Sequence, residues 1–451
     1  MTGMKFKFKF GDFFLGLATF VVIVLSIILW IFIMTSDQRF SRINQTNNQV
    51  TRGQARTKNN KSLYDLYIPT NAYGFIDGKP YRLYDSKNNL PFEFTKELRQ
   101  VTATDLKKIG NNRTQYQELL NNPNFIQLSY PDQVTFGLFT PLANSKQKNR
   151  EFNRIFIPDN NKWVYLGNDQ SNTIYKVSLK KANFNRLRRY AKKAKNKTPV
   201  NFVRLKSSYS AFYSKSVNWS VYSYITTSQS DSYFVSRLLG TSGVTSKTNK
   251  NGRTTYSYNY YTRLKVPAAG ERNDHNFQYT HFEKGKIPSV NNRLLDSVYY
   301  VHKLGMTEQD LRFFDADNNV VRYTNYIEGI PVFLNDHDLQ VNNSFSSDAI
   351  NIEFNSINFQ IPIPFDGQTQ SLESTYDLVD SLEKHGLHQN DIERIMVGFK
   401  VEKDNSHHSL VNLIPTYYIK AYGEWKSQDE WQKQNISIYK DMEVKSKEEV
   451  K

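Results

Sequence analysis

The sequence contains no cysteine among its 451 residues. This absence excludes disulfide bonds, metal sites built from thiolates, and catalysis by a cysteine nucleophile. Whatever the chain does therefore rests on its other side chains. Apolar residues make up 39% of the sequence and aromatic residues 14%, which is typical of a globular protein rather than a disordered one.

The sequence also lacks the short motifs that mark common catalytic sites. It has no G-x-G-x-x-G or G-x-x-x-x-G-K-[ST] loop to hold phosphates, no H-E-x-x-H zinc motif and no G-x-S-x-G nucleophile motif. The 8 histidines are dispersed, and the pairs His385/His388 and His407/His408 are interpreted as exposed side chains rather than metal ligands. The sequence therefore predicts a protein that is not an enzyme, with no cofactor and no metal site.

Aromatic residues are abundant, with 29 tyrosines and 30 phenylalanines. Such rings suit the pleated surface of half-buried strands. A chain of 451 residues is long enough for two or three domains, each with its own core. We therefore expect an α+β protein with several domains built on antiparallel sheets.

Residues 13–34 form a long apolar segment without a charged side chain. A helix of this length extends about 33 Å, enough to cross a hydrocarbon core of about 30 Å. The run is too long for a cleaved signal peptide, and no A-x-A site follows it. We predict an uncleaved, single-pass membrane anchor. Since a long following domain can translocate despite its charge, residues 1–12 are expected in the cytoplasm and the remainder outside the cell.

Small residues lie on one side of this predicted helix. At helical spacing they form a stripe that contains Gly16, Thr19, Ile23, Ser26 and Trp30. Small residues let two helices approach closely in lipid, where threonine and serine can also form hydrogen bonds between helices. The stripe predicts contact with a partner helix; the alternative is that the anchor is only a tether.

The remaining sequence divides into segments of different composition. Residues 35–62 are polar and are interpreted as a stalk. Three α+β domains are expected after it, over residues 63–206, 207–343 and 344–438, and a charged tail over residues 439–451. The first contains a strand–helix–strand pattern over residues 173–205, and the second a hairpin turn at Asn251-Gly252 before a long tyrosine-rich strand.

The second and third segments share a repeated pattern. Each contains a helix with an apolar stripe, over residues 294–305 in one and 372–386 in the other, that ends at a glycine. Gly305 and Gly386 suit this position because the residue after a helix often has a left-handed conformation. A strand pair follows each helix. The pattern predicts two related α+β units in tandem, with chance similarity as the alternative.

A strongly basic segment spans residues 180–206, where no acidic residue occurs. Its helical part contributes the cations of a candidate polyanion-binding face: Arg186, Arg188, Arg189, Lys192, Lys193 and Lys195. Outside a cell, the available polyanions are lipid headgroups and wall teichoic acids rather than nucleic acid. The alternative is a solvated helix face in a chain of net charge +16.

Two stretches of the final third resemble the YycH (WalH) family. They are RYTNYIEGIPVF at residues 322–333 and LIPTYYIKAYGEW at residues 413–425. The physical reading of these stretches is structural: side chains alternate as in half-buried strands, and proline ends the pairing in the first. The basic segment at residues 180–206 does not correspond to a feature of the family pattern.

The resemblance implies an accessory regulator of the WalK/WalR (YycG/YycF) two-component system, which controls cell-wall metabolism in Gram-positive bacteria. Family members act with a YycI (WalI) protein and contact the sensor kinase partly through transmembrane helices, as inhibitors in some species and activators in others. The resemblance carries over no catalytic residue. It implies two related C-terminal domains. A teichoic acid-binding protein and an extracellular wall-modifying enzyme are the alternative functions.

Overall fold

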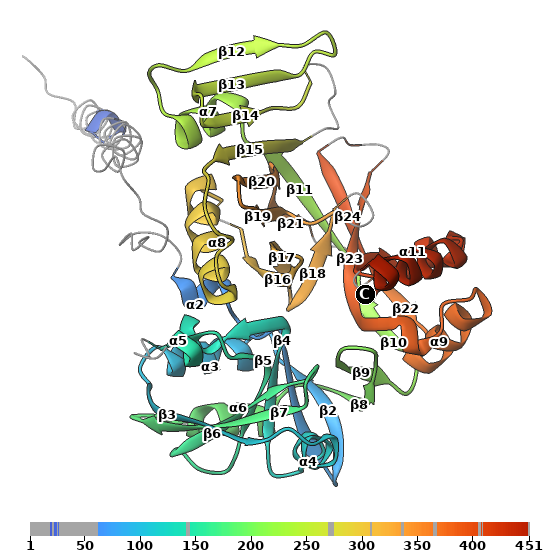
Figure 1. Ribbon diagram of the computed structural model, residues 1–451. Helices are drawn as coiled ribbons and strands as arrows, with labels where there is room; N and C mark the ends of the chain where they lie inside the picture. Colours follow the sequence, from blue (N-terminus) through green and yellow to red (C-terminus); the bar gives the residue numbers. More distant parts are fainter. Residues whose placement is uncertain are drawn as a thin grey trace, which may run out of the picture. The chain divides into compact units, whose positions relative to one another are not determined.

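The computed structural model describes residues 19, 22–24, 26, 62–140, 145–268, 275–306, 309–334, 338–363, 368–404, 407 and 409–449. The chain divides into a short unit, Met1–Ala55, and a large unit, Arg56–Lys451. All strands and labelled helices belong to the large unit (Figure 1). The predicted stalk lies outside the described residues, apart from Ser62.

The first sheet has nine antiparallel strands in the order β3-β7-β6-β5-β4-β1-β2-β8-β9. Their bounds are β1 Asn71–Ile76, β2 Lys79–Tyr84, β3 Thr102–Gly110, β4 Ile126–Thr135, β5 Glu151–Ile157, β6 Trp163–Asn168, β7 Thr173–Lys180, β8 Asn196–Arg204 and β9 Tyr209–Tyr213. Asp77 and Gly78 connect β1 to β2 with φ of 50° and 72°. Two positive φ angles in succession suit the tight turn of a hairpin.

Short helices accompany this sheet: α2 Leu63–Leu66, α3 Leu90–Leu98, α4 Arg113–Leu120, the 3-10 helix η2 Phe136–Leu138, α5 Ser145–Lys148 and α6 Asn185–Lys193. α3 and α6 pack together through the stacked rings of Phe94 and Phe184, whose centroids are 6.1 Å apart. The predicted strand–helix–strand pattern over residues 173–205 is confirmed as β7, α6 and β8.

The second sheet has fourteen strands. Its main path runs β12-β13-β14-β15-β20-β19-β17-β18-β23-β24-β11-β21, with β16 paired to β17 and β25 to β24. The strands from the first part of this segment are β11 Tyr222–Ser228, β12 Thr245–Thr248, β13 Thr254–Asn259, β14 Thr262–Lys265, β15 Asn276–Phe282, β16 Leu311–Asp317, β17 Val320–Ile327 and β18 Ile330–Phe333.

The later strands complete this sheet. They are β19 Val341–Phe345, β20 Ala349–Asn355, β21 Ile357–Ile363, β23 Ile392–Lys403, β24 Leu410–Ala421 and β25 Glu424–Ser427; β10 Val217–Ser220 and β22 Thr369–Leu372 form a separate pair. The helices in this part of the chain are α7 Asp231–Leu239, α8 Val290–Leu304, α9 Thr375–Lys384, η3 Gln389–Asp391, α10 Gln428–Lys433 and α11 Ile436–Glu449. The predicted class, α+β with antiparallel sheets, is confirmed, although β18 and β23 pair in parallel.

Both repeated glycines lie at helix ends. Gly305 follows α8 with a φ of 75°, and Gly386 lies just beyond α9 with a φ of 91°. The predicted start of the second helix is wrong, because Leu372 ends β22 and Ser374 caps α9 by accepting a hydrogen bond from the backbone N–H of Asp377. A strand hairpin follows each helix, β16–β17 in one case and β23–β24 in the other.

The strands cross the expected domain limits. β9 lies beyond residue 206 but completes the first sheet, and β19 contains both residue 343 and residue 344. β19 also pairs with β17 on one side and β20 on the other, so the second and third segments share a sheet. The expected limits at residues 206 and 343 thus do not coincide with the boundaries of the sheets. The division into three domains stays a prediction.

Two sequence expectations about strands are wrong. The tyrosine-rich strand after the confirmed Asn251-Gly252 turn is short: β13 ends at Asn259, and Tyr260 is 89% exposed. The strands in the two family-like stretches are buried on both faces rather than half-buried. In β17, Tyr323 and Thr324 point to opposite faces, yet both are at most 1% exposed. Other parts of the chain cover the second face.

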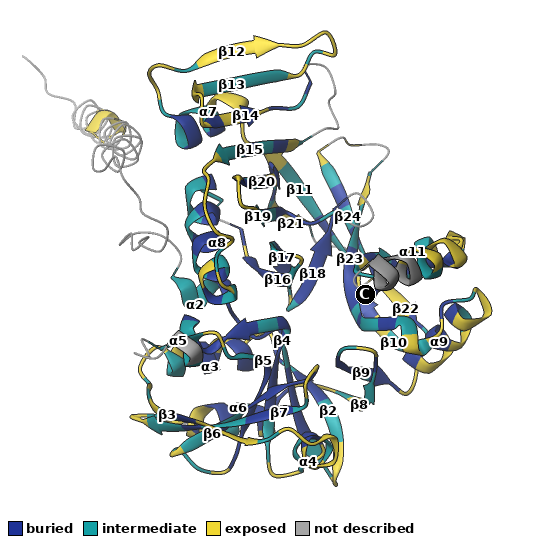
Figure 2. Cartoon of the chain, in the orientation of Figure 1, coloured by how far each residue is buried: buried dark blue, intermediate teal, exposed yellow. Residues whose placement is uncertain are grey.

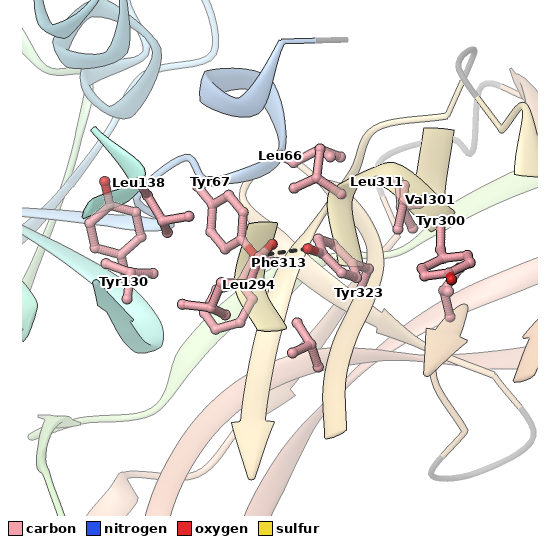
Figure 3. Packing of buried hydrophobic residues seen from close by; sticks show 14 of the residues in the cluster. Leu66, Tyr67, Tyr130, Leu138, Leu294, Tyr300, Val301, Leu311, Phe313 and Tyr323 are labelled. Atoms are coloured by element: carbon pink, nitrogen blue, oxygen red, sulfur yellow. Dashed lines mark hydrogen bonds between the residues drawn. The ribbon is translucent and has the colours of Figure 1, made fainter. Parts of the chain in front are cut away.

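One hydrophobic core connects the two sheets. α2 contributes Leu66, and Tyr67 follows directly after that helix (Figure 3). The Tyr67 hydroxyl donates to the Leu294 carbonyl oxygen of α8 at 2.9 Å and lies 2.8 Å from the Tyr323 hydroxyl of β17. A buried tyrosine needs such a partner for its hydroxyl. The first described residues of the large unit are thereby fixed to the second sheet.

Candidate functional site

A cavity of about 250 Å³ lies where the two sheets meet. Its lining is mostly polar, and three parts of the chain contribute the charged side chains. These are Asp132 and Glu151 from β4 and β5, Arg293 from α8, and Asp317, Glu393, Arg394 and Lys420 from β16, β23 and β24. The cavity is therefore the best candidate for a site in the described part of the chain.

Irregular strands place these side chains. Pro131 precedes Asp132 in β4, and the pairing of β4 with β5 is interrupted between Ser129 and Val134. Proline has no N–H for the ladder, so it is suited to such an interruption. Across the cavity, Asn318 and Asn319 both have positive φ and make the tight turn between β16 and β17. This turn holds Asp317 at the rim.

Beside the cavity, Asp132, Asp315, Asp317, Arg394 and Lys420 form a group of charged residues that we name the junction cluster. Lys420 Nζ lies 3.0 Å from Asp315 Oδ2 and 3.2 Å from Asp317 Oδ2, and Asp315 is completely buried. Arg394 pairs with Asp132 and donates to the Pro131 carbonyl oxygen at 2.6 Å. These pairs connect β4 of the first sheet to β23 of the second.

Side chains around the cluster add hydrogen bonds to its carboxylates. Trp425 Nε1 donates to Asp315 Oδ2 at 2.9 Å, and the Ala316 backbone N–H donates to Asp132 Oδ2 at 3.0 Å. The guanidinium of Arg322 lies 3.6 Å from Asp315 Oδ2. A buried carboxylate needs this density of donors, since an unpaired buried charge costs several kcal/mol.

The electrostatics of Lys420 favour its charged form. Burial disfavours its charge, but Asp315 and Asp132 outweigh burial and raise the pKa of Lys420. Lysines that act as nucleophiles or bases have a lowered pKa. The raised pKa of Lys420 therefore favours its charged form, which its carboxylate partners neutralise.

Asp132 titrates differently from Asp315. Burial raises the pKa of Asp132 to about 7 against the opposing effect of Arg394, and a hydrogen bond with Asp315 adds to the increase. Asp315 keeps its charge, because Lys420 outweighs burial and lowers its pKa. The two carboxyl groups therefore have pKa values shifted in opposite directions, upward for Asp132 and downward for Asp315.

This arrangement predicts a pH-dependent stability. The folded pKa of Asp132 exceeds the unfolded value near 3.8. The stabilisation that this shift provides is therefore complete below pH 3.8 and is lost as the pH rises toward 7. We expect the unfolding free energy of the wild type to fall by roughly 1–3 kcal/mol between pH 5 and pH 8, relative to Asp132→Asn. Denaturant unfolding of both proteins at the two pH values measures this. Equal changes in both would contradict it.

The basic segment is only partly free to bind a polyanion. Arg186 Nε lies 3.1 Å from Glu93 Oε1, and Arg188 donates to the Pro158 carbonyl oxygen at 2.8 Å, so both have structural partners. The other predicted cations are exposed: Arg189, Lys192, Lys193 and Lys195. The binding face stays a prediction, and its available charge is smaller than the sequence suggests.

The predicted anchor lies mostly outside the described residues. Thr19, Ile23 and Ser26 of the small-residue stripe are helical and exposed, while Gly16 and Trp30 lie outside the described residues. Among the residues that the structure describes, no helix has both the length and the apolar character needed to cross a membrane. The stripe and the anchor therefore stay predictions.

The sequence pointed to none of the cavity residues. Lys420 lies inside the family-like stretch at residues 413–425 but was expected to belong to an ordinary strand. A signal was present, because Lys420 is a lone cation among strongly apolar and aromatic neighbours. Such a residue needs a buried carboxylate partner. Asp315, which supplies it, is 105 residues away in the sequence.

The structure thus defines the chain as an α+β protein in which two antiparallel sheets are joined by a shared core and a buried charge cluster. Two family models match the sequence: YycH protein, N-terminal domain, over residues 17–196, and YycH protein, C-terminal domain, over residues 211–435. The chain belongs to the YycH family.

A solved structure has the same fold. The crystal structure of YycH from Bacillus subtilis matches with a TM-score of 0.67 at 16% sequence identity, covering 83% of this chain and 99% of that chain. No curated protein matches this sequence. At this low identity the structural likeness establishes the fold, while family membership rests on the two family models.

Proposed function

We propose that this chain is a non-enzymatic accessory regulator of a WalK-type (YycG) sensor histidine kinase that controls cell-wall metabolism. The observation that carries the proposal is membership of the YycH family over residues 17–196 and 211–435. The junction cluster is consistent with a regulator, because Lys420 is held as a cation and its charge is offset by carboxylates. A YycI-like protein is the proposed second partner.

The proposed topology is a single-pass membrane protein with residues 1–12 in the cytoplasm and the large unit outside the cell. The charge-free segment at residues 13–34 supports the anchor. Contact with the kinase would then use the anchor helix, through Gly16, Thr19, Ile23, Ser26 and Trp30, together with the outer unit.

Replacing Gly16 and Thr19 with leucine is expected to weaken association with the kinase. Close helix packing and polar contacts in lipid contribute about 0.6–2 kcal/mol each, so their joint loss should reduce co-purification roughly tenfold or more. Ala18→Leu, on the opposite side of the helix, is the matched control. The measurement is co-purification from membranes together with WalR-dependent transcription in a deletion strain complemented with each variant.

The outcomes separate the parts of the proposal. Deletion should change WalR-dependent transcription in either direction, and an unchanged level would overturn the regulatory function. If the Gly16/Thr19 variant binds and signals like the wild type, the anchor is only a tether. Turnover of a wall substrate that one point mutation abolishes would instead favour an extracellular enzyme.

A further inference from the structure

The end of the second sheet that contains β12, β13, β14 and β15 has one open face. Strand register aligns two rows of side chains across it: Lys247, Thr255, Lys265, Gln278 and Glu353 in one row, and Thr245, Ser257, Arg263, Thr280 and Asn351 in the other. We name this surface the outer face. Every member of the two rows is polar or charged.

The opposite face is buried in β14, β15 and the neighbouring β20, whereas β12 is exposed on both faces. Leu264, Phe277 and Phe354 lie on it, and Phe234 of α7 packs against both phenylalanines with ring centroids 4.8 Å apart. Since side chains alternate along a strand, burial of this face turns the two polar rows away from the core. Figure 2 shows β12 exposed at the end of the sheet.

Three cations of the outer face are exposed and close together. Lys247, Arg263 and Lys265 have no carboxylate within ion-pair distance in the described part of the chain. Lys265 Nζ lies 3.2 Å from the Gln278 amide oxygen, and the guanidinium of Arg263 stacks on Phe282 at 5.2 Å from the ring centroid. The charges are thus oriented by neighbours without being neutralised.

Exposed aromatic rings border the same strands. Tyr260 is 89% exposed and Tyr261 62% exposed at the turn between β13 and β14, and Tyr258 at the end of β13 is 50% exposed. Tyrosine combines an apolar ring with a polar hydroxyl, so it suits contacts with polar molecules that also present C–H surfaces. Sugars and polyols have this character.

We propose that the outer face binds an extended anionic polymer with a sugar or polyol backbone. Lys247, Arg263 and Lys265 would neutralise successive phosphodiester or carboxylate groups, and the serine, threonine and glutamine side chains would bind backbone hydroxyls. Lys247 and Lys265 are separated by one strand, about 10 Å, a distance that a flexible polymer spans easily.

The surface fits a polymer better than a lipid bilayer. Proteins that lie on membranes insert an apolar face into the boundary between headgroups and acyl chains. The outer face instead presents two flat rows of polar side chains, and Phe282 beside them is stacked with Arg263. Its cations are also separate from those of α6, which the sequence singled out.

The test measures binding of fluorescent poly(glycerol phosphate) to the full-length protein in an uncharged detergent at several salt concentrations. The variant is Lys247→Glu/Arg263→Glu/Lys265→Glu, and the matched control, Lys79→Glu/Lys108→Glu/Lys215→Glu, makes the same change in net charge at exposed lysines outside both basic surfaces. We expect the outer-face variant to lose at least about tenfold in affinity and to show a weaker salt dependence, because fewer counterions are released. The control should change affinity less than about threefold.

Other results would overturn the proposal. An equal loss in the outer-face variant and the control would assign binding to net charge. A loss only in a third variant, Lys192→Glu/Lys193→Glu/Lys195→Glu, would assign binding to the α6 side. Binding to vesicles containing phosphatidylglycerol but not to the polymer would identify a membrane surface instead. If the glutamate variant does not fold, the triple glutamine variant replaces it and is expected to lose affinity in the same direction. Tyr260→Ala/Tyr261→Ala should weaken binding while leaving the salt dependence unchanged, since it removes no charge.

Discussion

Replacing Asp315 with alanine is expected to lower the free energy of unfolding by about 3–5 kcal/mol. Asp315 is fully buried and faces Lys420, which is 3% exposed, and Trp425 donates to the same carboxylate oxygen, Oδ2. Without this carboxylate, Asp317 at the rim is the one close ion-pair partner left to Lys420 among the residues that the structure describes. A buried charge that loses its main partner is strongly destabilising, and this cost exceeds the net value of the original pair.

Denaturant unfolding of the full-length protein in detergent measures this loss. Asp315→Ala/Lys420→Met removes both charges and is expected to recover most of the stability, because no buried ion is then left unpaired. Asp105→Ala is the control: its pair with Lys107 is exposed on both sides, so the expected change is below about 1 kcal/mol. A double variant no more stable than Asp315→Ala would show that the cost does not come from the unpaired lysine.

Replacing Asp169, beside the first sheet, with alanine is expected to lower the free energy of unfolding by a similar amount, about 3–5 kcal/mol. Asp169 accepts two hydrogen bonds from Arg154, at 3.2 and 3.1 Å, and others from Asn153 and Tyr116. Both charged side chains are 3% exposed, so water cannot replace the missing carboxylate. Arg154 would then be a buried charge without its carboxylate partner. Its guanidinium also donates to the Tyr209 carbonyl oxygen of β9.

The pH dependence of Asp169 has the opposite sign to that of Asp132. Burial opposes its charge, but Arg154 outweighs burial and lowers the pKa of Asp169. Its contribution is therefore present above the unfolded pKa near 3.8 and is lost as pH falls through the lower folded value. The difference in unfolding free energy between the wild type and Asp169→Ala should therefore become smaller in strong acid. A difference that is constant down to pH 2 would contradict this account.

Local signals in the sequence predicted local structure well. The Asn251-Gly252 turn, the helix-ending Gly305 and the order of β7, α6 and β8 all depend on neighbouring residues. These features follow from backbone conformations that only a few residue types adopt readily. They are therefore visible without knowledge of the rest of the chain.

Contacts between distant segments were not predictable in the same way. Burial on the second face of β17 depends on residues that no local pattern identifies, so its strand looked half-buried. Arg188 looked like a free cation, but the backbone of residues 158–160 accepts its hydrogen bonds. The cavity likewise requires Asp132 and Arg394 to meet, although 262 residues separate them.

The pairing of β11 has a consequence for the order in which the chain can fold. β11 is among the first strands of the second sheet to be made, yet its neighbours are β21 and β24, and Tyr222 pairs with Leu413. Its hydrogen bonds must wait for nearly the whole chain to emerge, and closing so long a loop is slow. During synthesis β11 therefore exposes two unpaired edges, which bind other strands readily. The second sheet is complete only when strands near the C-terminus of the chain have been made. A chain whose synthesis is interrupted would therefore be open to aggregation and proteolysis.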